Sequence, residues 1–367
     1  MELEFNRKLI LEDGSEYLGY AFGDESDKIT EIVFNTSCVG YQEIISDPSY
    51  TYQTVVMAYP LIGNYGIAED DFETETPTIG GLVVRDYNNI PSNFRSIKTL
   101  SEIMREHHIP GIYGVDTRML VRSIRDLGSR MALITDINTT AEEGIRRIRE
   151  FVVPNDAVSK VSRKSIVEYN VPDAKYHVVA IDCGMKQNIV RSLNNKKCNV
   201  TVVPWDTTVE ALEALSPDGI FISNGPGDPT DAVPVIDLVK KLHGKYPIFG
   251  ICLGHQIISL SYGAKTYKLK FGHRGGNHPV KNLKNGKIEI TSQNHSYAVD
   301  TLSLDNTPLS ITHINILDNT VEGVECKTDK IFSVQYHPES APGPQDSAYL
   351  FDRFIDLMED EKNAKKN

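Results

Sequence analysis

The chain has 367 residues, of which 40% are hydrophobic and 24% are charged, and its formal net charge is -12 at pH 7. This composition is typical of a globular protein, and the length allows about two domains. The acidic balance argues against a protein that binds nucleic acid or an anionic membrane surface.

The first residues of the chain and its five cysteines indicate the cellular compartment in which the protein is expected. Residues 1–14 contain no basic stretch followed by a long apolar one, so we expect no secretory signal. No apolar run approaches the length of a membrane span. The cysteines are odd in number and lie far apart, a pattern that predicts neither a disulfide framework nor a zinc site. The sequence therefore predicts a cytoplasmic protein with free thiols.

The first part of the chain, residues 1–153, mixes short strand-like runs with turns and predicts a mixed α/β domain. Lys8–Leu11 and Tyr17–Phe22 flank an Asp-Gly turn, which indicates a β-hairpin. Helices are expected at Leu100–His107 and at Thr117–Leu127, where apolar residues recur at helical spacing.

The pattern of apolar residues changes after the stretch 154–175, which we expect to be a linker. From 176 to 362, short apolar runs alternate with helical stretches, as in a mostly parallel sheet flanked by crossover helices. The expected helices of this α/β domain are Lys186–Leu193, Val209–Leu215, Val233–Leu242, His255–Tyr262 and Ala348–Met358. Shorter and more exposed strands are expected at Lys287–Thr291, Leu309–His313, Val321–Cys326 and Ile331–Gln335. Residues 363–367 form a polar tail.

The strongest chemical signal is a Gly-x-Cys-x-Gly turn centred on Cys252. An apolar run precedes the turn and a helical stretch follows it, which is the pattern of a nucleophile elbow with sulfur in place of oxygen. Gly250 and Gly254 are explained if side chains there would collide with neighbouring elements. The elbow would lift the thiol to the carboxyl edge of the sheet and to a helix N-terminus, where a thiolate is favoured. A lone cysteine would be interpreted as structural, but the flanking glycines predict a nucleophile.

A thiolate nucleophile needs an imidazole partner, and His337 is the best placed of the ten histidines. It follows an apolar run, and Glu339 lies two residues further on, near enough to orient the ring. In isolation each would be interpreted as an ordinary surface residue. Together with Cys252 they predict a Cys–His–Glu triad.

A turn rich in glycine and proline, Ser223–Pro229, follows the apolar run Gly219–Ile222. Such a rigid turn can direct backbone N–H groups into a site, so the N–H groups of Gly225 and Leu253 are candidates for holding an oxyanion. The turn lacks the third glycine and the directly following helix of a dinucleotide-binding loop.

These motifs, in this order on an alternating α/β pattern, resemble the triad-type (class I) glutamine amidotransferases over roughly residues 176–362. The resemblance implies that Cys252 attacks the side-chain amide of glutamine and forms a γ-glutamyl thioester with release of ammonia. It also implies that His337 transfers the proton and that Glu339 orients His337.

Further segments resemble one branch of that family, the small, glutamine-hydrolysing subunits of carbamoyl phosphate synthetases. Those in the amidotransferase part are Asp182–Ile189, Phe271–Pro279 and Thr291–His295. Those in the first domain are Phe34–Thr36, Gly40–Glu43, Asp47–Tyr50, Tyr59–Asn64 and Gly114–Arg118. The glutaminases of GMP synthetase and anthranilate synthase do not carry this first domain, so the resemblance spans nearly the whole chain.

The resemblance implies a heterodimer in which this chain delivers ammonia to a large subunit, which makes carbamoyl phosphate from bicarbonate and ATP for arginine or pyrimidine synthesis. ATP and Mg are expected on the large subunit, because this chain has no Gly-x-x-x-x-Gly-Lys-[Ser/Thr] loop. No cofactor is expected in this chain, and no Asp/Glu/His cluster in the sequence predicts a metal site. The first domain would mainly dock the large subunit.

The resemblance also implies a glutamine pocket. The residues at matching positions are Ser49, Gly225, Gly227, Leu253, Gln256, Asn294, Ser296 and Tyr297. Ser49 would bring the first domain into the pocket, although on its own it would be interpreted as a turn serine. Ser296 departs from the family pattern, which usually has glycine there. We expect its N–H to matter more than a glycine-specific backbone conformation.

Two alternatives from other functional classes remain at this point. The first is a regulatory or scaffolding subunit that keeps the fold without the chemistry, and the intact triad argues against it. The second is another hydrolase on the same fold, such as a γ-glutamyl peptidase, and the N-terminal domain argues against that.

Overall fold

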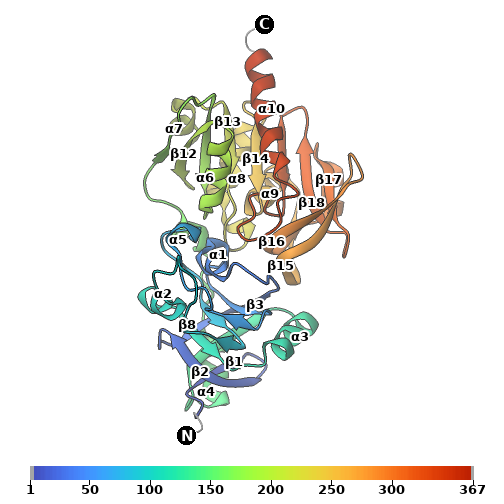
Figure 1. Cartoon of the computed structure of the whole chain (residues 1–367). Coiled ribbons are helices and arrows are strands. Elements are labelled where there is room, and N and C mark those ends of the chain that lie inside the picture. Colours follow the sequence, from blue (N-terminus) through green and yellow to red (C-terminus); the bar gives the residue numbers. More distant parts are fainter. Residues whose placement is uncertain (1–3, 365–367) are drawn as a thin grey trace. The chain divides into compact units, whose positions relative to one another are not determined.

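The computed structural model describes residues 4–364, and the chain divides into two compact units, Met1–Pro154 and Asn155–Asn367 (Figure 1). The predicted α/β class with a separate N-terminal mixed domain is confirmed. The last helix extends to Ala364, so it takes in the start of the predicted polar tail, and residues 365–367 of that tail lie outside the described residues. No helix within residues 4–364 is both long enough and apolar enough to cross a membrane.

Seven strands of the first unit form a closed barrel in the order β1-β2-β8-β6-β4-β3-β9. The predicted hairpin is present, since β1 and β2 are antiparallel with Leu9 opposite Tyr17. The barrel strands are β1 (Arg7–Leu11), β2 (Glu16–Gly23), β3 (Lys28–Asn35), β4 (Gln53–Met57), β6 (Gly81–Val83), β8 (Pro110–Tyr113) and β9 (Arg130–Asp136). A separate short pair consists of β5 (Leu61–Ile62) and β7 (Asp86–Tyr87).

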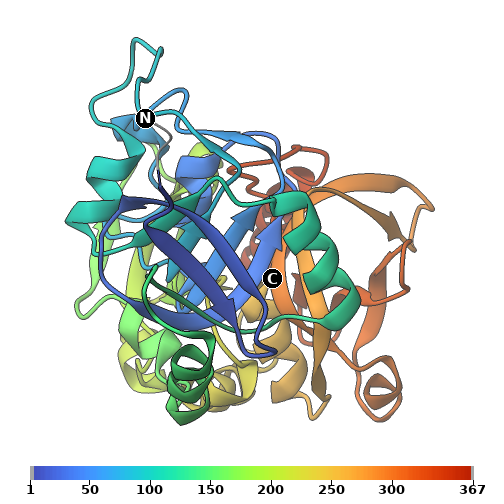
Figure 2. The ribbon, with the colours of Figure 1, turned by 90° about the horizontal axis from the view of Figure 1, so that it is seen from below.

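Within residues 4–154, four helices accompany the barrel: α1 (Tyr41–Ser46), α2 (Leu100–Glu106), α3 (Thr117–Leu127) and α4 (Ala141–Glu150). The two helices expected from periodicity, α2 and α3, are confirmed, and each begins at a side-chain cap, Thr99 for α2 and Asp116 for α3. In Figure 2 the blue-green helix α3 lies beside the barrel, where it packs on β3 and β4. Short 3-10 turns occur at η1 (Pro48–Tyr50) and η2 (Glu69–Asp71).

The second unit is built on a ten-stranded sheet in the order β10-β12-β11-β13-β14-β19-β18-β17-β15-β16. Its central strands, from β12 to β19, are parallel, and the flanking strands are antiparallel. The parallel strands are β11 (Tyr176–Asp182), β12 (Cys198–Pro204), β13 (Gly219–Ile222), β14 (Ile248–Ile251) and β19 (Ile331–Val334). The others are β10 (Val167–Tyr169), β15 (Thr266–Asn282), β16 (Ile288–Val299), β17 (Ser310–Asn315) and β18 (Val321–Cys326).

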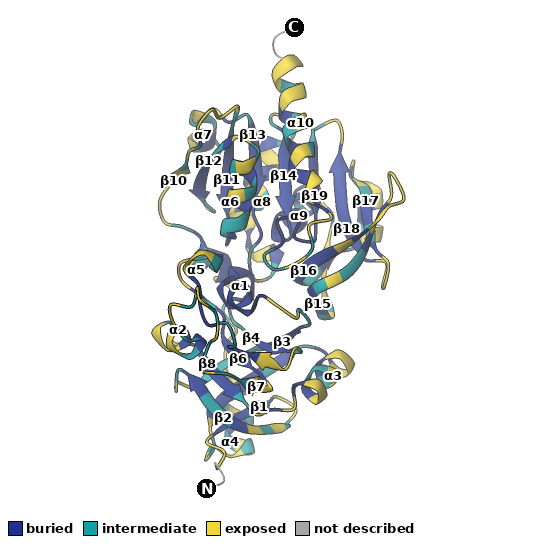
Figure 3. Ribbon diagram, in the orientation of Figure 1, coloured by how far each residue is buried: buried dark blue, intermediate teal, exposed yellow. Residues whose placement is uncertain are grey.

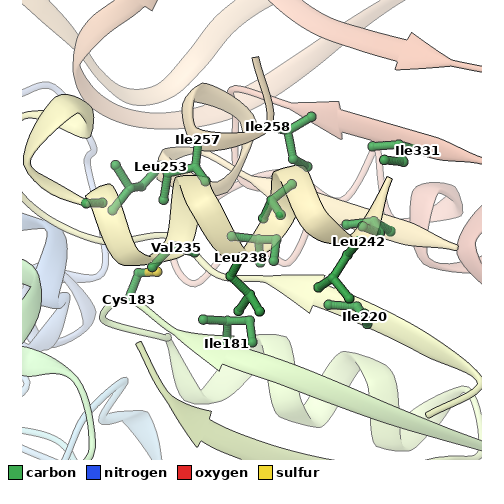
Figure 4. Close-up of a cluster of buried hydrophobic side chains, with 14 of the residues drawn as sticks. Ile181, Cys183, Ile220, Val235, Leu238, Leu242, Leu253, Ile257, Ile258 and Ile331 are labelled. Carbon is green, nitrogen blue, oxygen red and sulfur yellow. The ribbon is translucent and has the colours of Figure 1, made fainter. Parts of the chain in front are cut away.

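Helices cover both faces of the parallel strands, so β13, β14 and β19 are buried throughout and most residues of β11 and β12 are buried too (Figure 3). The helices are α5 (Ala157–Val161), α6 (Gln187–Asn195), α7 (Val209–Ala214), α8 (Val233–Leu242), α9 (Leu253–Ser261) and α10 (Tyr349–Ala364), with 3-10 turns η3 (Pro229–Asp231) and η4 (Thr301–Asn306). Side chains alternate along each strand, so Ile220 packs with α8 and α9 in one core (Figure 4) and Phe221 packs with α6 and α10 in the other.

The stretch 154–175, expected to be a linker, contains regular structure. It includes α5 and β10, and β10 pairs antiparallel with β12 at the edge of the sheet. Within it, the N–H of Arg163 donates to Asp182 Oδ2 at 3.0 Å. Both elements are too short to produce a periodic pattern, which is why the sequence did not indicate them.

The strands towards the C-terminus differ from the expectation of short and exposed elements. Strand β19 is fully buried beside β14 in the parallel centre, and β18 next to it is fully buried as well. Strand β16 has 12 residues and β15 has 17. Strand β15 was not predicted, because its sequence is rich in glycine, lysine and histidine, which are weak strand signals.

Candidate active site

The predicted elbow is present between β14 and α9, with Cys252 at its apex. Cys252 has φ 53° and ψ -103°, a backbone conformation that is costly for a residue with a side chain. Its N–H donates to Val334 O of β19 at 2.9 Å, which continues the pairing of the two strands into the turn. The surrounding structure therefore holds the turn in its strained form.

The expected reason for the two elbow glycines is confirmed. A Cβ on Gly254 would lie 2.2 Å from the carbonyl oxygen of Ile222, and one on Gly250 would lie 2.8 Å from the backbone of Gly254. Both distances are far below van der Waals contact. The helix α9 can pack this closely on the sheet only where side chains are absent.

His337 and Glu339 follow strand β19 and are buried, with 2% and 4% exposure. The N–H of His337 donates to Ser292 O at 2.9 Å, which fixes the backbone of this turn. His337 Nδ1 and Glu339 Oε1 are 2.6 Å apart. The carboxylate thus binds one ring nitrogen and orients the other for the Cys252 sulfur, whose interaction with His337 favours the protonated ring.

Lys186 is a further member of the site that the sequence did not single out. Its ammonium group donates to Glu339 Oε1 at 3.0 Å and also to the carbonyl oxygen of Ser340. The side chain is buried, and its backbone N–H donates to Asn224 Oδ1 at 3.1 Å. Its signals in the sequence were its place between an apolar run and a helical stretch and its position within the family-like segment Asp182–Ile189.

The opposite charges of Lys186, Glu339 and His337 offset the free-energy cost of burying each of them. Burial raises the pKa of Glu339, but the charges of Lys186 and His337 outweigh it and lower the pKa to about 2. Burial lowers the pKa of His337, but the charge of Glu339, the interaction with Cys252 and the hydrogen bond with Glu339 raise it to about 10. At neutral pH the site therefore holds an imidazolium beside the sulfur, which is the partner that a thiolate nucleophile requires.

The turn after β13 adjoins the start of α9. A Cβ on Gly225 would lie 2.8 Å from Cδ2 of Leu253 and 2.1 Å from the carbonyl oxygen of Cys183. Ser223 Oγ accepts the N–H of Cys183 at 2.9 Å, so hydrogen bonds tie the turn to the segment after β11. Leu253 is the first residue of α9, and its N–H has no partner inside the helix.

Strand β16 runs past the sulfur and carries three of the predicted pocket residues. Cys252 Sγ donates to Asn294 O at 3.6 Å. Gln256 Nε2 donates to Tyr297 O at 2.8 Å and to Gln335 Oε1 at 2.9 Å, so this side chain holds the strand in place. Ser296 Oγ accepts a hydrogen bond from the Arg274 guanidinium, a bond that glycine could not make.

Two further expected pocket residues, Ser49 and Gly227, form contacts within their own units. Ser49 lies on η1 of the first unit, where its N–H donates to Asp47 Oδ1 at 2.9 Å. Gly227 has φ 89°, and a Cβ there would lie 3.2 Å from Cβ of Ala157 in α5. Their part in a glutamine pocket stays a prediction.

Replacing Lys186 with methionine is expected to lower the free energy of unfolding by ~3–5 kcal/mol at neutral pH, because Glu339 would be left buried without its cation. The pKa of Glu339 is depressed from 4.5 to about 2, so the stability that it contributes is present above pH 4.5 and is lost towards pH 2. Urea unfolding at several pH values should show the difference between the two proteins shrinking over that range.

The matched control for this variant is Lys196→Met. Lys196 forms an ion pair with Asp352 that is partly exposed, so its loss should cost roughly 1 kcal/mol or less. Equal losses in the two variants would contradict a special contribution of the Lys186 pair.

The two parts of the chain match two family models. Residues 179–357 match glutamine amidotransferase class-I. Residues 9–134 match the carbamoyl-phosphate synthase small chain, CPSase domain. The first match takes in the elbow and the predicted triad, and the second lies within the barrel unit.

Similar proteins cover almost the whole chain. The carbamoyl phosphate synthase small chain of Staphylococcus saprophyticus is 54% identical over 359 residues, which are 98% of each chain. That of Fusobacterium nucleatum is 53% identical over 96% of this chain and 98% of its own. The pyrimidine-specific small chain of Bacillus subtilis is 49% identical over 96% of each. With relatives this similar along nearly its entire length, the chain belongs to the carbamoyl phosphate synthase small chain family and carries the class I glutamine amidotransferase domain of that family.

Proposed function

We propose that this chain hydrolyses glutamine to glutamate and ammonia at Cys252 and passes the ammonia to the large subunit of a carbamoyl phosphate synthase. The observation that carries the proposal is the buried series of contacts from Lys186 through Glu339 to His337, which ends beside a sulfur at the apex of a strained elbow. A buried and charged arrangement of this kind is costly, and catalysis accounts for it.

In the proposed mechanism, the thiolate of Cys252 attacks the side-chain amide carbon of glutamine. The N–H groups of Leu253 and Gly225 bind the oxyanion that forms, which a thioester-forming reaction requires. The His337 imidazolium gives its proton to the leaving nitrogen, so ammonia departs and the γ-glutamyl thioester remains. Neutral His337 then takes a proton from water, which attacks the thioester and releases glutamate and the thiolate.

The pocket for glutamine would lie along strand β16, at Asn294, Ser296 and Tyr297. The bond from Arg274 to Ser296 and the bond from Gln256 to Tyr297 support this, because both hold the strand whose N–H groups would bind the α-carboxylate. Gln256 thus acts by positioning the strand. Ser49, Gly225 and Gly227 complete the proposed pocket.

A diazoketone analogue of glutamine tests the proposed nucleophile directly. The analogue should alkylate Cys252 alone among the five cysteines, and glutamine should protect it. Peptide mass spectrometry would locate the adduct. Modification at another cysteine, with loss of activity, would overturn the assignment.

We also propose that the first unit docks the large subunit, through a basic hollow on α3. The hollow has a volume of about 760 Å³, and its charged lining residues are Arg85, Asp116, Arg118, Arg122 and Arg125. Arg118, Arg122 and Arg125 recur along one face of the helix. In a chain with a net charge of -12, this local excess of arginine fits an acidic surface on the partner.

Reversing the charge of Arg122 is expected to weaken the binding of the large subunit by roughly tenfold or more, because arginines at the centre of an interface carry much of its energy. Arg122→Glu should be titrated with the large subunit by calorimetry at fixed salt. The control is Arg149→Glu, which reverses an exposed charge on α4 outside the hollow. Equal affinities of the two variants would contradict docking at this hollow.

The rate of glutamine hydrolysis with and without the large subunit gives a second test of the proposed function. Ammonia that escapes is wasted, so we expect glutamine hydrolysis by the isolated chain to be slow. The large subunit, with ATP and bicarbonate, should stimulate it strongly. A fast and uncoupled rate in the isolated chain would count against delivery to a partner.

A further inference from the structure

Three buried side chains from three strands of the second unit lie close together, and one of them, His295, stands between Asn294 and Ser296 of the proposed glutamine pocket. They are His273 on β15, His295 on β16 and Glu322 on β18. One potential ligand atom from each lies within 4.8 Å of the others. We propose that these three residues bind a divalent metal ion of the zinc class, which goes beyond the proposed glutaminase activity.

The strand register explains how the two histidines meet. His273 and His295 are directly opposite each other in the antiparallel pair β15–β16, so their side chains project from the same face. Their ring centroids are 4.9 Å apart and their planes are nearly perpendicular, at 86°. Two imidazoles in this arrangement can direct one nitrogen each towards a shared point.

Two atoms of the cluster are buried and have no hydrogen-bond partner among the described residues. They are Nδ1 of His273 and Oε2 of Glu322, and their residues are 7% and 0% exposed. His273 Nδ1 lies 3.6 Å from Glu322 Oε1, which is too long for a hydrogen bond. Buried polar atoms without partners destabilise the folded state, and a bound cation would satisfy both.

The other polar atoms of the three residues are bound as a metal site requires. His273 Nε2 lies 2.8 Å from Asp318 Oδ2, and His295 Nδ1 lies 2.7 Å from Tyr297 O. Glu322 Oε1 accepts a hydrogen bond from Asn315 Nδ2 at 3.0 Å. Metal-binding histidines commonly donate their second N–H to a carboxylate or a carbonyl in this way, which fixes both ring and tautomer.

The donor set indicates the class of metal. Two imidazole nitrogens and one carboxylate are ligands that suit zinc and related transition metals, and they are a poor set for magnesium or calcium. His295 Nε2 is hydrogen-bonded to Gln293 Oε1 at 2.8 Å, so a metal ion at this nitrogen would replace that bond, and the freed amide oxygen could then serve as a further ligand. The charges of Glu322 and Asp318 would balance a divalent ion.

The site would brace the strand that forms the proposed pocket. His295 lies between Asn294 and Ser296 in the sequence. The carbonyl oxygen of Asn294 is 3.6 Å from the Cys252 sulfur and accepts a hydrogen bond from it. An ion held by three strands would join β15, β16 and β18 at this point. The role is therefore structural, and it does not depend on any step of glutamine hydrolysis.

The test is a titration of the full-length chain, stripped with a chelator, with cobalt(II) as a spectroscopic probe. We expect one equivalent to bind and to give visible d–d bands without the near-ultraviolet band of a cobalt–thiolate bond. Glu322→Gln should bind at least ~10-fold more weakly. The matched control is Glu289→Gln, which changes a buried glutamate of β16 outside the cluster and should bind like the unmodified chain.

A second measurement uses the unmodified chain and Glu322→Gln without a spectroscopic probe. Zinc should raise the thermal midpoint of the unmodified chain and leave that of Glu322→Gln unchanged, because a ligand that binds the folded state stabilises it. No uptake of cobalt or zinc by the unmodified chain would overturn the proposal and leave a hydrogen-bonded cluster. A thiolate band, or equal binding by Glu322→Gln, would place the metal elsewhere and overturn it too.

Discussion

Replacing Cys252 with serine is expected to reduce glutamine hydrolysis by roughly 10³-fold or more. A serine hydroxyl is far less acidic than a thiol, so the imidazolium of His337 cannot sustain an ionised nucleophile in its place. Steady-state release of glutamate from the complex with the large subunit measures the loss. The change in size is small, so the thermal midpoint should be nearly unaffected.

The same variant separates the two half-reactions. Synthesis of carbamoyl phosphate from free ammonia by the complex should survive in Cys252→Ser, because that chemistry belongs to the large subunit. Cys38→Ser makes the same change at an exposed thiol and should leave both reactions intact. Retention of glutamine use by Cys252→Ser would remove Cys252 as the nucleophile, and loss of the ammonia reaction would indicate a disrupted complex.

Structural features that depend only on neighbouring residues in the sequence could be predicted. The elbow needs only a strand, two glycines and a helix, and the Cβ positions at Gly250 and Gly254 confirm why those residues are glycine. The helix Thr117–Leu127 was predicted with the bounds that the structure has, because its apolar residues keep one period and Asp116 caps it.

Features that depend on distant residues could not be predicted from one sequence. Lys186 contacts Glu339 across 153 residues of chain, and neither residue alone indicates the other. The cluster of His273, His295 and Glu322 depends on the strand order, which places β15, β16 and β18 in one antiparallel group. The burial of β19 has the same origin, since its place between β14 and β18 covers both of its edges.

Replacing Glu339 with glutamine is expected to lower the rate of glutamine hydrolysis by roughly 10²–10⁴-fold, as loss of the orienting carboxylate does in related triads. The charge of Glu339 is the main force that raises the pKa of His337, against burial. Without it, only the interaction with Cys252 would oppose burial, so the pKa of His337 should fall and a larger share of the ring should be neutral at neutral pH. The imidazolium that stabilises the thiolate would then be less populated.

The pH dependence of alkylation of Cys252 by iodoacetamide checks this reasoning, because the reagent reports the ionised sulfur. The unmodified chain should react readily at neutral pH, and Glu339→Gln should react slowly there. An unchanged pH profile in Glu339→Gln would contradict electrostatic control of His337 by this carboxylate.

Stability must be separated from catalysis in that experiment, because Glu339→Gln also leaves Lys186 buried without its anion. The double variant Lys186→Met with Glu339→Gln removes both charges and should recover much of the stability that the single variant loses. It should not recover the activity, because His337 still lacks the carboxylate that binds Nδ1 at 2.6 Å. A double variant that regains both would show that Glu339 acts through folding alone. A double variant that regains stability and stays inactive would assign Glu339 to the ionisation of His337 and so to the reactivity of Cys252.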